Sequence, residues 1–244
     1  MIKLFRRTRQ RLLTENKTGK YFKYAIGEIF LVVIGILIAL QINNWNEGRK
    51  ALIQEHAVLS NLVADLRADS ASYVENMADL DKTIVLHDQL YDVISNKSNG
   101  DSLRNVPKIR ALIWFNPITK ENDPFIASKT SNEVIRREIQ SYFRAMKNME
   151  HIYDEFSTVI KSQMRPYLGT KGLYNLKTEF EHSKTGPEWL DKQGLIELSR
   201  GSEFQQLLFE AHIKLREVKE KLGVLMKQNE ILKEKISLFL IDVN

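Results

Sequence analysis

Side chains able to support catalysis or bind a metal are few in this sequence. Its 244 residues include five histidines and no cysteine, which excludes thiolate catalysis, disulfides and cysteine-ligated zinc. Glu179 and His182 form the one Glu-x-x-His spacing, whereas a di-iron bundle needs two such pairs and two further glutamates. The pair also falls in a predicted connection between helices, where solvated side chains are the simpler interpretation. We therefore expect no metal site and no cofactor.

The sequence also lacks the motifs of the common enzyme mechanisms. It contains no G-x-S-x-G elbow, no H-E-x-x-H pair, no phosphate-binding loop and no dinucleotide fingerprint. His56 and His87 are 31 residues apart on one predicted helix, so they cannot bind the same ligand. Asp79 and Asp81 are neighbours on a helix surface, where paired acids are usually solvated. These observations predict a protein that is not an enzyme.

The most informative stretch is apolar and begins at Tyr24. From Ile29 to Leu40 no polar side chain interrupts it. With its flanks it amounts to about 20 residues, enough for the ~30 Å hydrocarbon core of a bilayer. Tyr24 and Trp45 stand at its two ends, where the headgroup layers would lie. The sequence predicts a single transmembrane helix over residues 24–45.

Charge gives that helix an orientation. Residues 1–45 hold eight Lys or Arg and two acids. The net charge of the chain is +5 and these residues supply +6 of it, so residues 46–244 sum to −1. Because positive flanks stay in the cytoplasm, we expect residues 1–23 to lie on the anionic inner leaflet of a bacterial inner membrane. Residues 46–244 are expected in the periplasm, and without a basic stripe they should not bind nucleic acid.

The beginning of the chain resembles a known family. Tyr24-Ala-Ile-Gly-Glu-Ile29, followed by Leu31-Val-Val-Ile-Gly-Ile-Leu-Ile-Ala-Leu-Gln-Ile-Asn-Asn-Trp45-Asn-Glu47, is similar to the signature of an uncharacterised membrane-protein family from Bacteroidota, a domain of unknown function. The resemblance is specific over about residues 1–50 and faint beyond them. It implies a bacterial inner-membrane protein with an N-terminal anchor, and it implies no activity.

Long helices are predicted for most of the remaining chain. Apolar residues recur in steps of four and three, the heptad pattern of packed helices, and no run alternates convincingly as a strand would. The pattern predicts long helices at about residues 46–96, 130–168 and 202–241. The first seam begins at Leu52 and has polar interruptions, one of them at Ser70.

The second and third seams are more regular. The second covers residues 135–167 and includes Gln163, and Thr130 is expected to begin and cap its helix. The third covers residues 204–239. Its polar member, Asn229, is of the kind that fixes helix register in coiled coils.

Together the seams predict an all-α fold. The transmembrane helix should continue into a coiled-coil-like three-helix bundle formed by residues 46–244, antiparallel in up-down-up order. In that order the connection 98–130 and the C-terminus both lie at the tip away from the membrane. Trp114, Phe115 and Phe125 then either cap the open end of the bundle or form an exposed patch, and capping is the expected role.

The membrane helix has a face suited to self-association. Gly35 and Ala39 form a small-xxx-small pattern, and Gly27 lies two turns earlier on nearly the same face. Glu28 borders that face and can add a hydrogen bond if it is protonated, or pair with Lys20 or Lys23 instead. We expect a homo-oligomer or a membrane-protein partner. A plain anchor is the alternative.

Three functions are compatible with this organisation. A non-enzymatic scaffold or protein-interaction module outside the cytoplasm is the leading hypothesis, since it requires only an anchor and a bundle. A ligand-sensing helical ectodomain is the alternative, and because no output domain is evident it would signal through a partner protein. A metal-dependent or hydrolytic enzyme is the least supported, because its motifs are missing.

Overall fold

The computed structural model describes residues 18–121, 126–180 and 189–242. Contacts divide the chain into two compact units, Met1–His56 and Ala57–Asn244. The all-α expectation is confirmed, because the described residues contain helices and no strand. Their one β-type pairing is an isolated antiparallel bridge between Tyr174 and Leu190.

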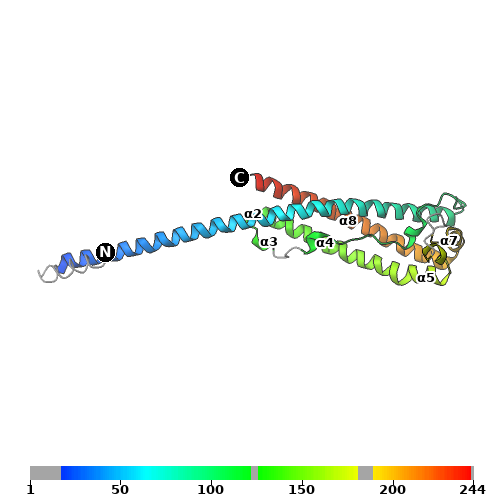
Figure 1. Ribbon diagram of the computed structural model, residues 1–244, viewed down its shortest axis with the longest axis horizontal. Helices are drawn as coiled ribbons and strands as arrows, with labels where there is room; N and C mark the ends of the chain where they lie inside the picture. Colours follow the sequence, from blue (N-terminus) through cyan, green and yellow to red (C-terminus); the bar gives the residue numbers. More distant parts are fainter. Residues whose placement is uncertain (1–17, 122–125, 181–188, 243–244) are drawn as a thin grey trace. The chain divides into compact units, whose positions relative to one another are not determined.

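The first unit contains the N-terminal part of helix α2, which spans Thr18–Ile94 (Figure 1). Its apolar side chains are exposed in this single chain, Ile29, Leu37 and Trp45 each by more than half of their surface. Among the described residues, this is the one helix long and apolar enough to cross a membrane. An apolar surface of this length without protein neighbours fits lipid better than water.

The second unit is built on three long helical segments. They are α2, then α4 (Glu133–Thr158) with its extensions η3 (Val159–Met164) and α5 (Arg165–Thr170), and α8 (Ser202–Asp242). Helix α4 begins one turn later than expected. Its cap is Asn132, whose side-chain oxygen accepts the backbone N–H groups of Val134 and Ile135 at 2.9 and 3.1 Å. The expected start and cap at Thr130 is therefore wrong.

Helix α8 runs antiparallel to α2. The amide nitrogen of Asn229 donates to the carbonyl of Leu66 at 3.0 Å. Lys219, ten residues earlier on α8, pairs with Asp81, fifteen residues later on α2. Going from the first contact to the second, the residue number falls along α8 and rises along α2, so the two helices are antiparallel.

Helix α8 is antiparallel to α4 as well. Lys235 pairs with Glu138 near the start of α4, and Lys214 pairs with Glu155 at 2.7 Å near its end. Since α2 and α4 are both antiparallel to α8, they are parallel to each other, as Figure 1 shows. The expected up-down-up order is wrong: the observed order is up-up-down, so α4 and α8 both run opposite to the direction expected relative to α2. The C-terminal end of α8 lies beside the start of α4, so the expectation of a C-terminus at the tip is also wrong.

The parallel order is possible because the connection after α2 travels back along the bundle. We call its residues 103–121 the returning segment (Figure 1). Lys108 pairs with Asp79 at 2.8 Å, and the N–H of Ile118 binds Asp69, ten residues nearer the start of α2, at 2.6 Å. The segment contains η1 (Val106–Arg110) and η2 (Ile118–Glu121), and α3 (Ile126–Lys129) follows before α4.

Two aromatic residues of this segment do not cap the bundle end. Phe115 packs along the side of the bundle, between the rings of Tyr73 and Tyr153 at centroid distances of 6.1 and 5.9 Å. Trp114 remains 80% exposed. The capping interpretation is therefore wrong for this pair, and Phe125 lies outside the described residues.

The predicted seam of α8 forms the core as expected. Its buried members are Phe204, Leu208, Ala211, Leu215, Val218, Leu222, Leu225, Asn229, Leu232 and Ile236. On the second helix the seam is correct up to Ile160 and fails at Gln163, which is exposed. The π-helix η3 adds backbone to that turn and shifts the register by one residue, so Met164 and Leu168 are buried instead.

The end of the bundle reached by α5 is covered by α7 (Lys192–Ser199), and α6 (Leu176–Phe180) comes between these two helices in the chain (Figure 1). The side chain of Asp191 caps α7 by accepting the N–H of Gln193 at 3.0 Å. Gly100 has φ of 90° and touches Ile196 of α7, so a side chain there would be both strained and obstructed.

Candidate functional site

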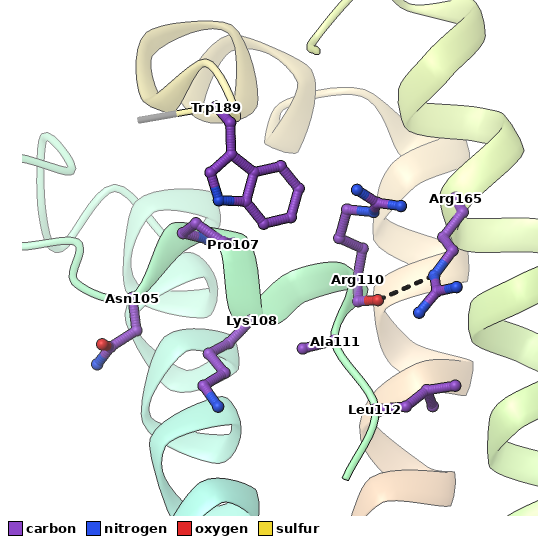
Figure 2. A pocket seen from close by; sticks show the side chains of 8 residues that line it. All are labelled: Asn105, Pro107, Lys108, Arg110, Ala111, Leu112, Arg165 and Trp189. Atoms are coloured by element: carbon purple, nitrogen blue, oxygen red, sulfur yellow. Dashed lines mark hydrogen bonds between the residues drawn. The ribbon is translucent and has the colours of Figure 1, made fainter. Parts of the chain in front are cut away.

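A basic and aromatic pocket of about 650 Å³ lies where η1 and α5 meet Trp189, three residues before the start of α7 (Figure 2). Eight residues line it: Asn105, Pro107, Lys108, Arg110, Ala111, Leu112, Arg165 and Trp189. This volume falls within the range of small-molecule pockets, and the pocket is open rather than enclosed.

Backbone pairing brings two aromatic rings to this pocket. The N–H of Asn175 donates to the carbonyl of Trp189, and the N–H of Asp191 donates to the carbonyl of Leu173, both at 2.9 Å. This short antiparallel bridge holds Tyr174 and Trp189 near each other although fifteen residues separate them in sequence. The Tyr174 hydroxyl also donates to the carbonyl of Arg165 at 2.8 Å, which fixes its ring against α5.

Both rings contact the guanidinium group of Arg110. Its central carbon lies 4.8 Å from the ring centroid of Tyr174 and 5.0 Å from that of Trp189. Cation–π contact of this kind holds a guanidinium in place while leaving its in-plane donors available. The Nε atom of Arg110 is buried and has no hydrogen-bond partner within the described part of the chain.

Arg165, the first residue of α5, reaches the same pocket beside Arg110 (Figure 2). Its Nε donates to the carbonyl of Arg110 at 3.1 Å, which places two cationic side chains in one pocket. Arg165 is the first residue after the π-helix, whose extra backbone turns Met164 into the core and leaves Arg165 beside the returning segment. π-helical turns are frequent at functional sites because they redirect single side chains in this way.

The third cation of the pocket is already neutralised. Lys108 pairs with Asp79 at 2.8 Å, and its hydrogen bond, with that of Lys82, lowers the pKa of the Asp79 carboxyl. No carboxylate pairs with Arg110 or Arg165 among residues 18–121, 126–180 and 189–242. Within these ranges the charge of both guanidinium groups is uncompensated, and it lies beside apolar walls, which suits an anion.

A buried polar network holds the returning segment that carries this pocket. The Asp69 carboxylate accepts the N–H of Ile118 at 2.6 Å and both the N–H and the hydroxyl of Thr119. The Tyr142 hydroxyl lies 2.8 Å from the hydroxyl of Thr119 and 3.0 Å from that of Tyr73. Burial raises the pKa of Tyr142 to about 12, so this phenol stays protonated. The network ties α2, the returning segment and α4 together.

A second hollow of about 560 Å³ lies between α2 and α8 and is lined by His87, Tyr91, Phe209 and His212 among others. The rings of His87 and His212 are 5.6 Å apart. Burial, assisted by the charge of His212, lowers the pKa of His87 to about 3. Neither ring nitrogen of His87 has a hydrogen-bond partner within the described part of the chain. His87 is thus a neutral core side chain near physiological pH.

The structure leaves the small residues of the predicted association face uncovered. Gly27, Gly35 and Ala39 are exposed, and a Cβ at either glycine would meet nothing within 4 Å. Glu28 is partly exposed. The face stays a prediction.

The other sequence candidates have structural explanations or lie elsewhere. Asp81 pairs with Lys219, and Asp79 with Lys108, so these acids link the bundle together and are not merely solvated. The Glu179–His182 spacing falls outside the described residues, since His182 and the side chain of Glu179 are not among them. The described residues hold no cluster of metal-binding side chains.

Sequence reasoning missed Arg110, Arg165 and Trp189. They are far apart in the chain, and no spacing rule connects them. A weaker signal was present on α2, where Leu62, Asp69, Asn76, Thr83 and Leu90 recur every seven residues and are all buried. This row of buried residues, distinct from the apolar seam and polar in its middle, lies on the side of α2 that binds the returning segment.

Comparison with known proteins yields one match. The model of a family of unknown function, DUF6090, matches residues 28–125, from the apolar stretch of α2 through the returning segment. The match is consistent with the expected likeness to an uncharacterised domain family. No curated protein and no solved structure matches the chain.

Proposed function

We propose that this chain is a single-pass protein of a bacterial inner membrane whose helical unit, outside the cytoplasm, acts as a non-enzymatic scaffold or interaction module. The apolar, exposed stretch of α2 supports the anchor. Eight basic residues against two acids in residues 1–45 support a cytoplasmic N-terminus. A homo-oligomer or another membrane protein is the partner that this arrangement favours.

Trp114 is the observation that carries the interaction role. Its side chain is 80% exposed, yet the backbone around it is held firmly. Its own carbonyl accepts from Asn76 at 3.0 Å, and that of Ile113 accepts from the Tyr153 hydroxyl at 2.6 Å. Tryptophan on a rigid support is the residue type most enriched at the energetic centres of protein interfaces. The exposed Ile118 follows on the same segment.

Site-specific photo-crosslinking tests this role in cells. A benzophenone amino acid replaces Trp114 in one strain and the exposed Lys227 of α8 in a matched control strain. The proposal predicts a discrete adduct from position 114 alone. An adduct of twice the chain mass identifies a second copy, and any other mass identifies a different partner. Equal adduct patterns at the two positions would contradict the proposal.

A ligand-sensing ectodomain is the second candidate, and the pocket around Arg110 and Arg165 favours it. In this case the bundle binds a small molecule and signals through a partner protein. The two candidates separate experimentally, because a scaffold needs no ligand for its crosslinks. Crosslinks from position 114 that change when a ligand is supplied would favour the sensor.

A further inference from the structure

We infer that the pocket between η1, α5 and Trp189 binds a small organic anion, a carboxylate attached to an apolar body. This inference rests on the second candidate function, the ligand-sensing ectodomain. Its basis is the convergence of apolar walls and two guanidinium groups that pair with no carboxylate of the described residues, in one volume of about 650 Å³.

Charge is the first step. The Arg165 Nε donates to the backbone carbonyl of Arg110, and both side chains line the same pocket. Of the cations that line the pocket, only Lys108 pairs with a carboxylate in the described part of the chain. An anion in the pocket gains charge-assisted hydrogen bonds from the guanidinium groups.

Geometry is the second step. The central carbon of the Arg110 guanidinium lies over the rings of Tyr174 and Trp189, 4.8 and 5.0 Å from their centroids. A guanidinium held over aromatic rings is preorganised and keeps N–H donors available for a ligand. A planar carboxylate accepts two parallel N–H groups from a guanidinium, which is the bidentate pairing that a point-like cation does not provide.

The apolar walls of the pocket indicate the chemistry of the remaining part of the ligand. Pro107, Ala111, Leu112 and the exposed part of Trp189 line the pocket beside the two arginines. Inorganic phosphate would satisfy the charge and leave these surfaces wet. A molecule that joins a carboxylate to a ring or an alkyl chain uses both parts of the pocket.

Calorimetric titration of the full chain in detergent micelles tests this inference. The probe is 3-phenylpropanoate, with 3-phenylpropanamide as the uncharged analogue and inorganic phosphate as the anion without an apolar body. We expect saturable binding of the carboxylate, and at least tenfold weaker binding of both other compounds. An amide or phosphate that binds as tightly as the carboxylate would overturn the inference, as would no saturable binding of any probe.

Variants tie the binding to the pocket. Arg165→Gln and Arg110→Met should each weaken 3-phenylpropanoate binding at least tenfold, with circular dichroism confirming the fold. Arg67→Gln, on an exposed position of α2, removes the same charge elsewhere and should leave binding unchanged. Unchanged binding in Arg165→Gln overturns the inference even if Arg110→Met does not fold. Failure here leaves the crosslinks of position 114 unaffected, so it is distinguishable from failure of the interaction role.

Discussion

Replacing Asp69 with Asn is expected to detach the returning segment from the bundle. The carboxylate of Asp69 is 2% exposed and accepts from two successive backbone N–H groups, one on each oxygen. Asparagine keeps one oxygen and presents an N–H₂ group in place of the other. Either the N–H of Ile118 or that of Thr119 then faces another donor and loses its partner.

The magnitude follows from these contacts. A buried donor left without an acceptor costs about 1–3 kcal/mol, and each charge-assisted bond that becomes neutral loses about 1 kcal/mol more. Removing a buried charge offsets part of this loss. We expect Asp69→Asn to destabilise the fold by about 2–4 kcal/mol.

Urea unfolding of residues 50–244, followed by circular dichroism at 222 nm, measures this change. With a slope of about 2 kcal/mol per molar urea, the midpoint should fall by about 1–2 M. The control is Asp88→Asn, an exposed carboxylate on the same helix, which should change stability by less than about 0.5 kcal/mol. A result for Asp69→Asn as small as that of the control would refute the anchoring role of the network.

Three further outcomes are expected. Leu222→Ala should cost roughly 2–5 kcal/mol in urea unfolding, because Leu222 is fully buried, whereas the half-exposed Val224→Ala should cost little. Between pH 6.5 and about 3 only the unfolded chain protonates His87, so stability falls as pH decreases. At pH 5 the loss should be about 2 kcal/mol, and unfolding of His87→Leu should lack it. Gly35→Ile, but not Ile36→Val, should abolish signal in a transmembrane association reporter carrying residues 21–48.

The contrast between the long helices shows what sequence patterns predict. The third seam was predicted position by position, because its residues from Phe204 to Ile236 are buried along one continuous α-helix with an uninterrupted heptad pattern. The second seam failed after Ile160, since a π-helix leaves no periodic trace. Helix positions were therefore accessible from sequence, and local departures from α geometry were not.

The helix order was not accessible from sequence. A connection of about 30 residues is long enough either to loop at the tip or to run back beside helices of this length. The chain runs back beside the helices because the buried side chains of Asp69 and Asn76 bind the returning segment. Their spacing of seven residues on α2 was the clue available in the sequence. The pocket depends on this path, because it brings Arg110 to Arg165 across 55 positions of sequence. No local pattern predicts such a meeting.

The most direct test of the proposed membrane orientation is a pair of reporter fusions after Asn244. The proposal predicts that alkaline phosphatase fused there is active, because this enzyme folds only outside the cytoplasm. A fluorescent protein that folds only in the cytoplasm should be dark at the same position. An inactive phosphatase together with a bright fluorescent fusion would place residues 46–244 in the cytoplasm and contradict the proposal.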